Sequence, residues 1–193
     1  VTPSLNIITV IILNIKPLAG GKGERTFTMA NAFYPLYEPA FFKDFRDLIE
    51  VSAKKYPDRI AFSFKKDPRD KDTVRVTYTH AREYIRALGT GLIALGLREK
   101  HGAIVGESSY EWICSYFALM AIGAVTVPID KELPAEEIAS IMNTAECEAI
   151  VYSRSIEDKM ETVRKEVSCL KTCICMRDTE APGVLKLSDI VTD

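Results

Sequence analysis

Apolar residues along this chain recur at helical spacing in some segments and form short unbroken runs in others. From Phe41 to Lys54 they recur at helical spacing with charged residues between them, which predicts an amphipathic helix. The apolar positions of this helix are Phe41, Phe42, Phe45, Leu48, Ile49 and Ala53. Pro39 stands just before the helix and Tyr56-Pro57-Asp58 ends it, because the residue before a proline avoids helical backbone angles.

A hairpin and a second helix are predicted next. Ile60–Phe64 and Val74–Tyr78 alternate between apolar and polar residues, and the polar stretch 65–72 between them is typical of a hairpin loop. Thr79 is the predicted N-cap of a helix that reaches about Leu95 and ends at Gly96. The predicted buried stripe of this helix consists of Ala81, Tyr84, Ile85, Leu88, Leu92 and Leu95.

Four apolar runs without polar alternation follow, with helical segments between them. The runs are Ala103–Val105, Val125–Ile129, Ala149–Tyr152 and Thr172–Met176, and they recur roughly every 22 residues. Strands that are buried on both faces have this pattern, and they occur in parallel sheets covered by helices. The sequence therefore predicts an α/β fold of parallel βαβ units, preceded by a helix and a β-hairpin.

The connecting helices have recognisable starts. Ser108 and Glu111 fit a capping box before Trp112–Ile122. Pro134 fits the first position of the next helix, with Glu136 and Glu137 in its first turn. Ser155, followed by Glu157 and Asp158, is expected to open the last helix, at 156–167. The helix from Tyr110 to Ile122 is apolar almost all round, so we expect it to be largely buried.

The first 28 residues have a different character. The apolar run Leu5–Ile15 is too short for a bilayer-spanning helix, which needs about 20 residues, and it could equally form a strand. A signal peptide requires basic residues before its apolar run, and none precedes this run. Residues 19–25 (AGGKGER) lack the spacing of a phosphate loop and are typical of a flexible linker. We hypothesise that residues 1–28 are a non-native or flexible leader and that the natural protein starts at Met29.

Composition and charge exclude several classes of protein. Hydrophobic residues make up 47% of the 193 residues and charged residues 27%, which is ordinary for a globular protein and excludes a disordered or collagen-like chain. The net charge is −2, and acidic and basic residues are interleaved. No basic block of the kind that follows a phosphate backbone occurs, so nucleic-acid binding is not expected.

The five cysteines indicate reduced thiols in a cytoplasmic protein. They are Cys114, Cys147, Cys169, Cys173 and Cys175. An odd number at wide spacing is not a disulfide framework. Metal binding is not favoured, because C-x-x-C pairs and neighbouring histidines are lacking. Cys173 and Cys175 should instead face one side of a strand and pack in the core.

The turn after the first buried strand is the first place to look for chemistry. In open α/β sheets ligands bind beyond the carboxyl ends of the strands. Asp130 follows the second strand at about the offset of a ribose-binding acid, but the turn 105–109 (VGESS) has only Gly106 of the three glycines of a dinucleotide site. Glu107 would also direct a carboxylate at the pyrophosphate. We therefore interpret Gly106 and Ser108 as turn and cap residues.

Other chemical motifs have simpler explanations. Ser108 and Ser109 lack the G-x-S-x-G context of a nucleophile elbow. Glu107 and Glu111 could be imagined as a carboxylate pair, but capping and solvent exposure explain them more simply. Within the second helix, glycines should allow close packing, and a third glycine should end it. These three glycines are Gly89, Gly91 and Gly96.

The chain resembles the start of the adenylate-forming (AMP-binding) superfamily, which includes acyl-CoA synthetases, peptide-synthetase adenylation domains and luciferases. The resemblance covers roughly residues 40–176 and rests on the order and spacing of several weak motifs. They read YPDRIAF at 56–62, VTYTHAREYIRALGTGLIALGL at 76–97 and AIVGESSYEWICSYFALMAIGAVTVPIDKELPAEEI at 103–138. The turn GESSYEW and the segment VPIDKELP resemble most closely the bacterial long-chain fatty-acid–CoA ligases, although Ser108 stands where those enzymes usually have asparagine.

The resemblance implies a reaction of two steps. A carboxylic acid and ATP with Mg²⁺ give an acyl-adenylate, and the thiol of CoA then releases AMP. In the family the glycine-rich phosphate loop, the ribose-binding acid and the catalytic lysine all lie downstream of the region that resembles it. No T-S-G-T-T-G-like run occurs up to Asp193, so no catalytic, cofactor-binding or metal-binding residue can be assigned here.

The resulting expectation is that residues 29–193 form an incomplete N-terminal subdomain of an AMP-dependent ligase. Alone, the chain should be inactive and should bind neither ATP, Mg²⁺ nor CoA. We also expect it to self-associate through an exposed sheet edge near Met176. The alternatives are a non-catalytic interaction module on the same scaffold and a small Rossmann-type nucleotide-binding domain.

Overall fold

Five parallel strands form the centre of the fold. The computed structural model describes residues 41–67 and 69–191 of the chain. The strands are β3 (His101–Val105), β4 (Val125–Ile129), β5 (Ala149–Tyr152), β6 (Thr172–Cys175) and β7 (Leu185–Lys186). They lie in the order β4-β3-β5-β6-β7, and every neighbouring pair is parallel. The predicted parallel α/β sheet is therefore confirmed.

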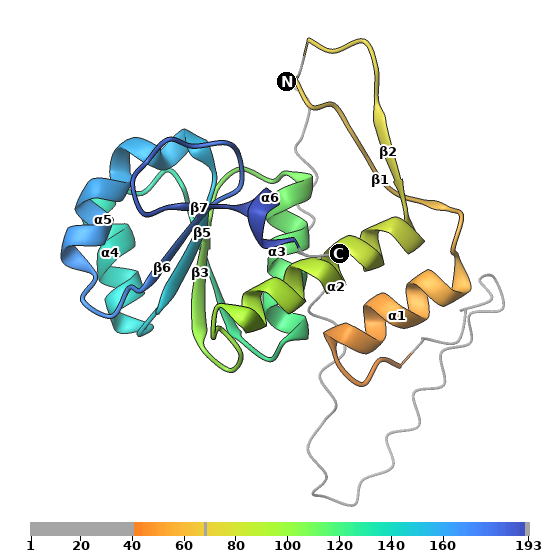
Figure 1. The fold of residues 1–193 in the computed structure, drawn as a ribbon, viewed down its shortest axis with the longest axis horizontal. Coiled ribbons are helices and arrows are strands. Elements are labelled where there is room, and N and C mark those ends of the chain that lie inside the picture. The colour runs from red at the N-terminus through yellow and green to blue at the C-terminus, as the bar shows by residue number, and fades with distance from the viewer. Residues whose placement is uncertain (1–40, 68, 192–193) are drawn as a thin grey trace, which may run out of the picture. The chain divides into compact units, whose positions relative to one another are not determined.

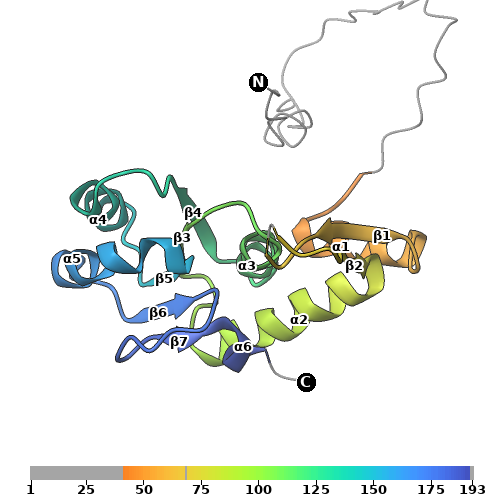
Figure 2. The ribbon, with the colours of Figure 1, turned by 90° about the horizontal axis from the view of Figure 1, so that it is seen from above.

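Helices cover both faces of this sheet (Figures 1 and 2). One face carries α4 (Ala135–Thr144), the 3-10 helix η2 (Arg154–Lys159) and α5 (Met160–Glu166). The other face carries α2 (Tyr78–Ala94), α3 (Tyr110–Ala121) and α6 (Leu187–Ile190). Each helix that links two parallel strands thus packs on the sheet it connects, as βαβ units require.

The alternation of side chains along the strands divides the core into two clusters. On β3, Ile104 points toward α2 and α3, while Ala103 and Val105 point toward α4 and α5. On β5, Val151 and Tyr152 divide in the same way. Buried apolar area is the main stabilising term of such a sheet, at about 25 cal/mol per Å². The unbroken apolar runs of the sequence therefore reflect two separate cores that share the same strands.

A helix and a β-hairpin precede the sheet, as the sequence predicts. They are α1 (Phe45–Lys55) and the antiparallel pair β1 (Ile60–Phe64) and β2 (Val74–Thr77). α1 contacts α2 and α3. Two aromatic residues of β1, Phe62 and Phe64, pack on Tyr110 at the start of α3, with ring centroids 5.4 and 5.1 Å apart. Aromatic contacts thus join the hairpin to the helix layer of the sheet.

The N-caps of two helices differ from the predicted residues. α2 is capped by Thr77, whose hydroxyl accepts from the backbone N–H of His80, whereas the hydroxyl of the predicted cap Thr79 donates to the carbonyl of Pro57. α3 is capped by Ser109 instead of Ser108, since the Ser109 hydroxyl accepts from the backbone of Trp112. In each case a second hydroxyl residue stands one or two positions away, and the cap is the one with extended backbone angles whose hydroxyl accepts from the first turn.

The first helix starts later than its apolar pattern predicts. Asp44 is the N-cap of α1, because its side chain accepts from the backbone N–H of Asp47. Phe41 therefore lies outside the helix and is 85% exposed, and Phe42 is also exposed. The prediction that both face the core is wrong. Helical spacing of apolar residues cannot reveal a cap that cuts the helix short.

The starts of the last two connecting helices also differ from the prediction. Pro134 is the residue before the first turn of α4 instead of its first residue, although Glu136 and Glu137 do occupy that turn. The segment predicted as one helix from 156 to 167 is divided between η2 and α5, and η2 itself is kinked at Ile156. Ser155 lies inside η2 and does not open a helix.

Burial on both faces holds for the central strands and fails at one edge. β3 and β5 are almost wholly buried, whereas β4 is an edge strand in which only Ile129 is buried and Val125 is 51% exposed. The strand that ends near Met176, β6, is not itself the predicted edge, because the two-residue strand β7 pairs with it and forms the edge on that side. α3 is likewise only half-buried, with four fully buried residues, Cys114, Ser115, Ala118 and Leu119. The stripe residue Leu95 of α2 is also exposed.

Two glycines of the α2 region have the roles that the sequence predicts. A Cβ atom on Gly91 would lie 2.0 Å from the carbonyl oxygen of Ile190, so α6 approaches α2 closely only because residue 91 has no side chain. Gly96, just past the helix, has a φ of +78°, which favours glycine.

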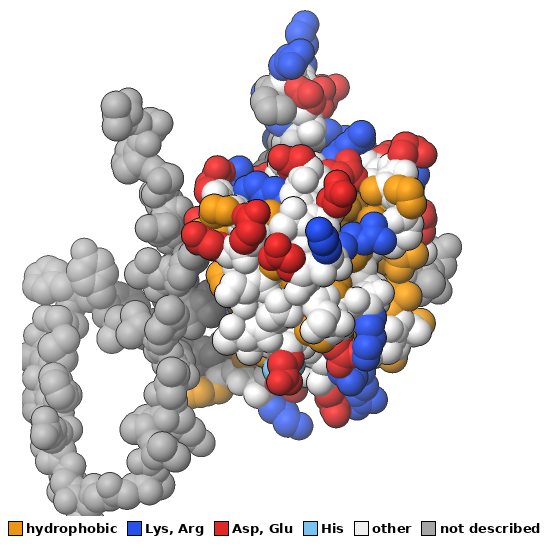
Figure 3. Space-filling model, turned by 90° about the vertical axis from the view of Figure 1, so that its left-hand side faces the viewer, with side chains coloured by type: hydrophobic (Ala, Val, Ile, Leu, Met, Phe, Trp, Pro, Cys, Tyr) orange, Lys and Arg blue, Asp and Glu red, His pale blue; other side chains and the backbone are white. Residues whose placement is uncertain are grey.

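The surface over α4 and α5 is mixed in charge. Figure 3 shows acidic and basic side chains interspersed on this face, with small apolar areas between them. Across residues 41–67 and 69–191, no helix has both the length and the apolar character to cross a bilayer. Residues 1–28 lie outside the described residues, and so do the apolar run Leu5–Ile15 and the segment 19–25 within them.

Candidate functional site

The strand order identifies one place where an open sheet of this kind would bind a ligand. The chain passes from β3 to β4 on one side and then crosses to β5 on the other side of β3. Ligands of open α/β sheets bind beyond the carboxyl ends of the strands at such a reversal. Two segments meet there, the turn 106–109 after β3 and Ser153–Ser155 after β5. This switch point is the candidate functional site.

Three side chains of the switch point are bonded to one another. The Oε2 atom of Glu107 accepts hydrogen bonds from the hydroxyls of Ser153 and Ser155, each at 2.7 Å. The two hydroxyls are themselves 2.7 Å apart. Ser153 is buried, while Glu107 remains exposed on its outer side. The two strand ends are thus tied together by the chain's own polar groups.

Gly106 allows this close approach of the two strand ends. A Cβ atom at position 106 would lie 2.8 Å from the Cβ of Ser153 and 2.9 Å from its Oγ, so a side chain there would separate the segments. In a phosphate-binding turn, glycine lets the backbone approach the ligand. Here Ser153, directly after β5, fills the space that a ligand would take, so Gly106 serves the packing of the protein itself.

The electrostatics of the switch point are anionic. Partial burial raises the pKa of the Glu107 carboxyl, but hydrogen bonds from Ser153 and Ser155, with help from the Lys131 ammonium, outweigh it and hold the pKa below its usual value. Glu107 is therefore ionised at neutral pH and can only accept hydrogen bonds. A phosphate placed beside it would be repelled, so these residues do not fit the phosphates of ATP or of a dinucleotide.

The second carboxylate, Glu111, belongs to a separate network. Its Oε2 lies 3.2 Å from Nη2 of Arg177, which follows β6, and the Glu111 side chain is only 17% exposed. Burial, with Cys114 and Glu111 nearby, raises the pKa of Tyr84 to about 12. The interpretation of Glu107 as a solvent-exposed residue is confirmed, although it also bonds Ser153 and Ser155, whereas the interpretation of Glu111 as an exposed residue is wrong. Glu107 joins the ends of β3 and β5, Glu111 joins α3 to Arg177 after β6, and the two carboxylates do not act as a pair.

The remaining residues singled out in the sequence have structural roles. The Asp130 carboxylate accepts from the backbone N–H of Glu132 and so closes a local turn after β4. Ser109 is the helix cap described above, and Ser108 is exposed. Cys173 and Cys175 both pack in the cluster under α4 and α5, as predicted. Within the described ranges, no three His, Cys, Asp or Glu side chains are grouped as a metal site would need.

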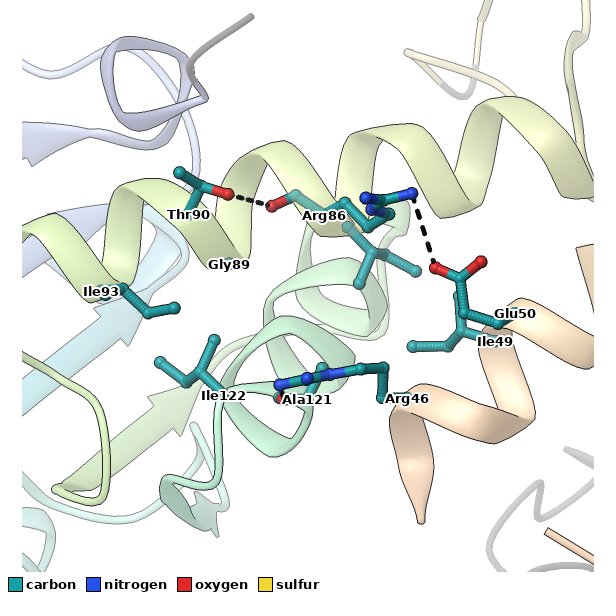
Figure 4. A pocket seen from close by; sticks show the side chains of 10 residues that line it. Arg46, Ile49, Glu50, Arg86, Gly89, Thr90, Ile93, Ala121 and Ile122 are labelled. Atoms are coloured by element: carbon teal, nitrogen blue, oxygen red, sulfur yellow. Dashed lines mark hydrogen bonds and ion pairs between the residues drawn. The ribbon is translucent and has the colours of Figure 1, made fainter. Parts of the chain in front are cut away.

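A groove of about 500 Å³ lies between α1, α2 and the end of α3 (Figure 4). Its floor is apolar and is formed mainly by Ile49, Ile85, Gly89, Ile93 and Ile122. Along its rim, Arg46 donates to the carbonyl of Ala121 at 2.7 Å, and Arg86 pairs with Glu50 at 3.8 Å. The charged groups of the rim are thus engaged with the protein, and the groove has the character of a packing defect beside α1.

A second cavity, of about 470 Å³, lies between α5 and the segment that leads to β7. Its lining includes Tyr152, Met160, Arg164 and Val184. Tyr152 is fully buried, and its hydroxyl has no hydrogen-bond partner among the described residues. Burial raises the pKa of this phenol, with Cys175 and Glu157 nearby, so it stays neutral. No signal in the sequence distinguishes Tyr152 from an ordinary core residue.

Comparison with known proteins gives a consistent result. The sequence model of a family described as AMP-binding enzyme matches residues 49–189. The chain is 38% identical over 72 residues to the long-chain-fatty-acid–CoA ligase FadD15 of Mycobacterium bovis, covering 37% of this chain and 12% of that protein. It is 28% identical over 153 residues to the phosphinothricin tripeptide synthetase PhsC of Streptomyces viridochromogenes, covering 76% of this chain and 13% of that protein.

A solved structure shows the same fold. The putative long-chain-fatty-acid CoA ligase from Rhodopseudomonas palustris superposes with a TM-score of 0.69 at 23% sequence identity. The match covers 78% of this chain and 36% of that one. The chain therefore spans only a minor part of the length of the proteins that it matches.

Proposed function

Because this chain belongs to the AMP-binding enzyme family, we propose that it forms the N-terminal part of a fatty-acid–CoA ligase. The observation that carries the proposal is the family match, which runs from α1 to α6 and so includes the whole described sheet. Two of the proteins it resembles bear the name of long-chain-fatty-acid–CoA ligases. In the full-length protein, ATP-dependent formation of an acyl-adenylate would be followed by thioester formation with CoA.

In this proposal the 193-residue chain supplies scaffold and no catalytic group. Transfer of the adenylyl group of ATP to a carboxylate, with loss of pyrophosphate, needs hydrogen-bond donors and cations that stabilise developing negative charge. The switch point instead presents the ionised carboxylate of Glu107, held by Ser153 and Ser155. The sequence also lacks a glycine-rich T-S-G-T-T-G-like run. ATP, Mg²⁺ and CoA would accordingly bind the full-length ligase and not this chain, whose location we propose to be cytoplasmic.

An exchange assay tests the catalytic part of the proposal. The purified 193-residue chain is incubated with ATP, Mg²⁺, labelled pyrophosphate and a long-chain fatty acid, next to a complete long-chain fatty-acid–CoA ligase as positive control. We expect acid-dependent label in ATP from the complete enzyme only. Clear exchange by the 193-residue chain would refute the claim that its residues carry no catalytic site.

A chimera tests the ligase assignment itself. Residues 41–191 replace the matching region of a complete long-chain fatty-acid–CoA ligase, and the chimera is assayed for acyl-CoA formation. A scaffold from the same kind of enzyme should leave activity within about tenfold of the parent, a change of about 1.4 kcal/mol in the barrier. A chimera that folds, as judged by a cooperative melting transition, but has no activity would contradict the assignment.

The strand order keeps one alternative open, a small nucleotide-binding domain. The order β4-β3-β5-β6-β7 is that of doubly wound sheets that bind nucleotides at the β3–β5 reversal. The carboxylate of Glu107 at that position disfavours a dinucleotide. We expect NAD to leave the melting temperature of the chain unchanged, and a saturable rise would favour this alternative over the ligase scaffold.

A further inference from the structure

Cys147 and Cys169 lie side by side where two neighbouring strands begin. Cys147 precedes β5, and Cys169 lies in the turn between α5 and β6. β5 and β6 are parallel neighbours, and the carbonyl of Glu148 accepts from the backbone N–H of Lys171 at 2.8 Å. The thiol of Cys169 donates to the carbonyl oxygen of Cys147 at 3.2 Å. The sulfur of one cysteine is thus in contact with the backbone of the other.

The two side chains also point to the same side of the sheet. Cys147 is a fully buried member of the cluster under α4 and α5, and Cys169 packs against that cluster while remaining partly exposed. Adjacent strands are about 4.8 Å apart, and a disulfide needs Cα atoms about 4.4–6.8 Å apart. Cys147 and Cys169 lie on neighbouring segments of this kind, and both contact the same cluster.

We propose that Cys147 and Cys169 are a site of reversible oxidative modification, at which a peroxide produces an intramolecular disulfide. In the first step the thiol of Cys169 loses its proton, and the thiolate attacks the peroxide O–O bond. This gives a sulfenic acid and expels hydroxide or an alkoxide, which the released proton converts to water or an alcohol. In the second step the thiol of Cys147 attacks the sulfenic sulfur, loses its proton and expels water. Two thiols are oxidised by two electrons, and one peroxide is reduced.

Accessibility sets the order of the two steps. Cys169 is the partly exposed member of the pair, whereas the other four cysteines are buried. Burial, with the neighbouring Cys169, raises the pKa of the Cys147 thiol to about 11, so Cys147 is a poor first nucleophile. Cys169 therefore meets the oxidant first and Cys147 resolves the product. Cys114, in the cluster on the opposite face of the sheet, cannot reach either sulfur.

The disulfide would close a loop that contains β5, η2 and α5. The two cysteines are 22 positions apart, so the link removes freedom from a substantial part of the unfolded chain. We expect the oxidised chain to melt several degrees higher than the reduced chain, and a reducing agent to reverse the shift. The loop also carries Ser153 and Ser155, so oxidation stiffens one side of the switch point.

The experiment uses the full 193-residue chain and hydrogen peroxide. The chain is treated with equimolar peroxide, free thiols are blocked, and peptides from a non-reducing digest are identified by mass spectrometry. We expect a peptide that links Cys147 to Cys169, together with the rise in melting temperature. Cys169→Ser should abolish both results, while the matched control Cys114→Ser should keep both.

Three outcomes would overturn the proposal. They are a disulfide between other cysteines, a Cys169 that stops at sulfinic acid with Cys147 still free, and a linked peptide found only between two chains. Should Cys169→Ser fail to fold, Cys147→Ala provides the second test. In that variant peroxide should convert Cys169 to an acid, because no thiol remains to resolve the sulfenic form, and an unmodified Cys169 would contradict the order of steps.

Discussion

The buried hydroxyl of Tyr152, in the cluster under α4 and α5, allows a test of core stability. An unpaired polar group in a protein interior costs about 1–3 kcal/mol relative to a paired one. Because the Tyr152 hydroxyl has no partner among the described residues, Tyr152→Phe should raise the free energy of unfolding by about 1 kcal/mol. Urea denaturation measures this change. Tyr116→Phe, at a half-buried ring on α3, is the control and should alter stability by less than about 0.5 kcal/mol. A loss of stability in Tyr152→Phe would show that the hydroxyl is bonded in solution.

Glu107 should make the stability of the chain depend on acid pH. Its pKa is lower in the folded state than the usual 4.5, so the unfolded state binds the proton more tightly. The stabilisation is complete above the usual pKa and is lost as the pH falls through the lowered one. Glu107→Gln should cost about 1 kcal/mol at pH 7, a small value because the carboxylate is exposed.

The pH series provides the check on this assignment. The difference in unfolding free energy between the natural chain and Glu107→Gln should shrink as the pH falls below 4.5. Ser155→Ala removes one of the two donors and should reduce the difference in part. If this difference stays constant down to the pH at which the chain unfolds in acid, the interaction of Glu107 with Ser153 and Ser155 does not depend on charge.

The contact between α2 and α6 depends on a single missing side chain. In Gly91→Ala the new methyl group would lie 2.0 Å from the carbonyl oxygen of Ile190, so α6 must move away. We expect the free energy of unfolding to fall by about 3 kcal/mol or more. Overpacking of a core typically costs about 1–3 kcal/mol, and the contacted backbone carbonyl, unlike a side chain, cannot relieve the clash by rotating. Thermal unfolding measures the loss.

Gly89, on the same helix, is the matched control. A Cβ there would lie 3.3 Å from a methyl group of Ile122, which can shift slightly. Alanine also gains up to about 1 kcal/mol of helix propensity over glycine. Gly89→Ala should therefore be nearly neutral. Equal losses for the two variants would mean that α6 does not pack on α2 in solution.

The helices and long strands could be predicted from the sequence because their periodicity is local. Ile60–Phe64, Val125–Ile129 and Ala149–Tyr152 have the same bounds in the structure as in the prediction. Caps are harder, since the choice between Ser108 and Ser109 depends on backbone angles that a pattern does not contain. β7 and α6, with two and four residues, are too short to show any period.

The candidate site was only partly accessible to the same reasoning. The sequence places Glu107 in the turn after a buried strand, and the structure confirms that turn at the carboxyl end of β3. Its bonding partner Ser153 is 46 positions away. That contact follows from the strand order, which puts β5 beside β3, and local patterns do not contain strand order. For the same reason the strand ending near Met176 is predicted as a sheet edge, whereas β7 pairs with it and the two edge strands are β4 and β7.

The edge strand β4 bears on how copies of the chain behave together. One side of β4 pairs with β3, and among the described strands none pairs with its other side. An open edge presents backbone donors and acceptors to other chains, and exposed apolar side chains strengthen such pairing. Val125 is 51% exposed at the start of this strand. Pro128 protects only the far end, where it removes one backbone donor. We therefore propose that the chain self-associates through β4.

Light scattering at micromolar concentration tests this proposal. We expect the 193-residue chain to form dimers or larger species, and Val125→Lys to shift the population toward monomer, because a charged side chain on an edge strand opposes pairing. Val51→Lys, at another exposed valine on α1, is the matched control and should leave the association unchanged. If the natural chain is a clean monomer, the β4 edge does not pair. If both lysine variants shift the population toward monomer equally, the added charge accounts for the shift, and pairing through the β4 edge does not.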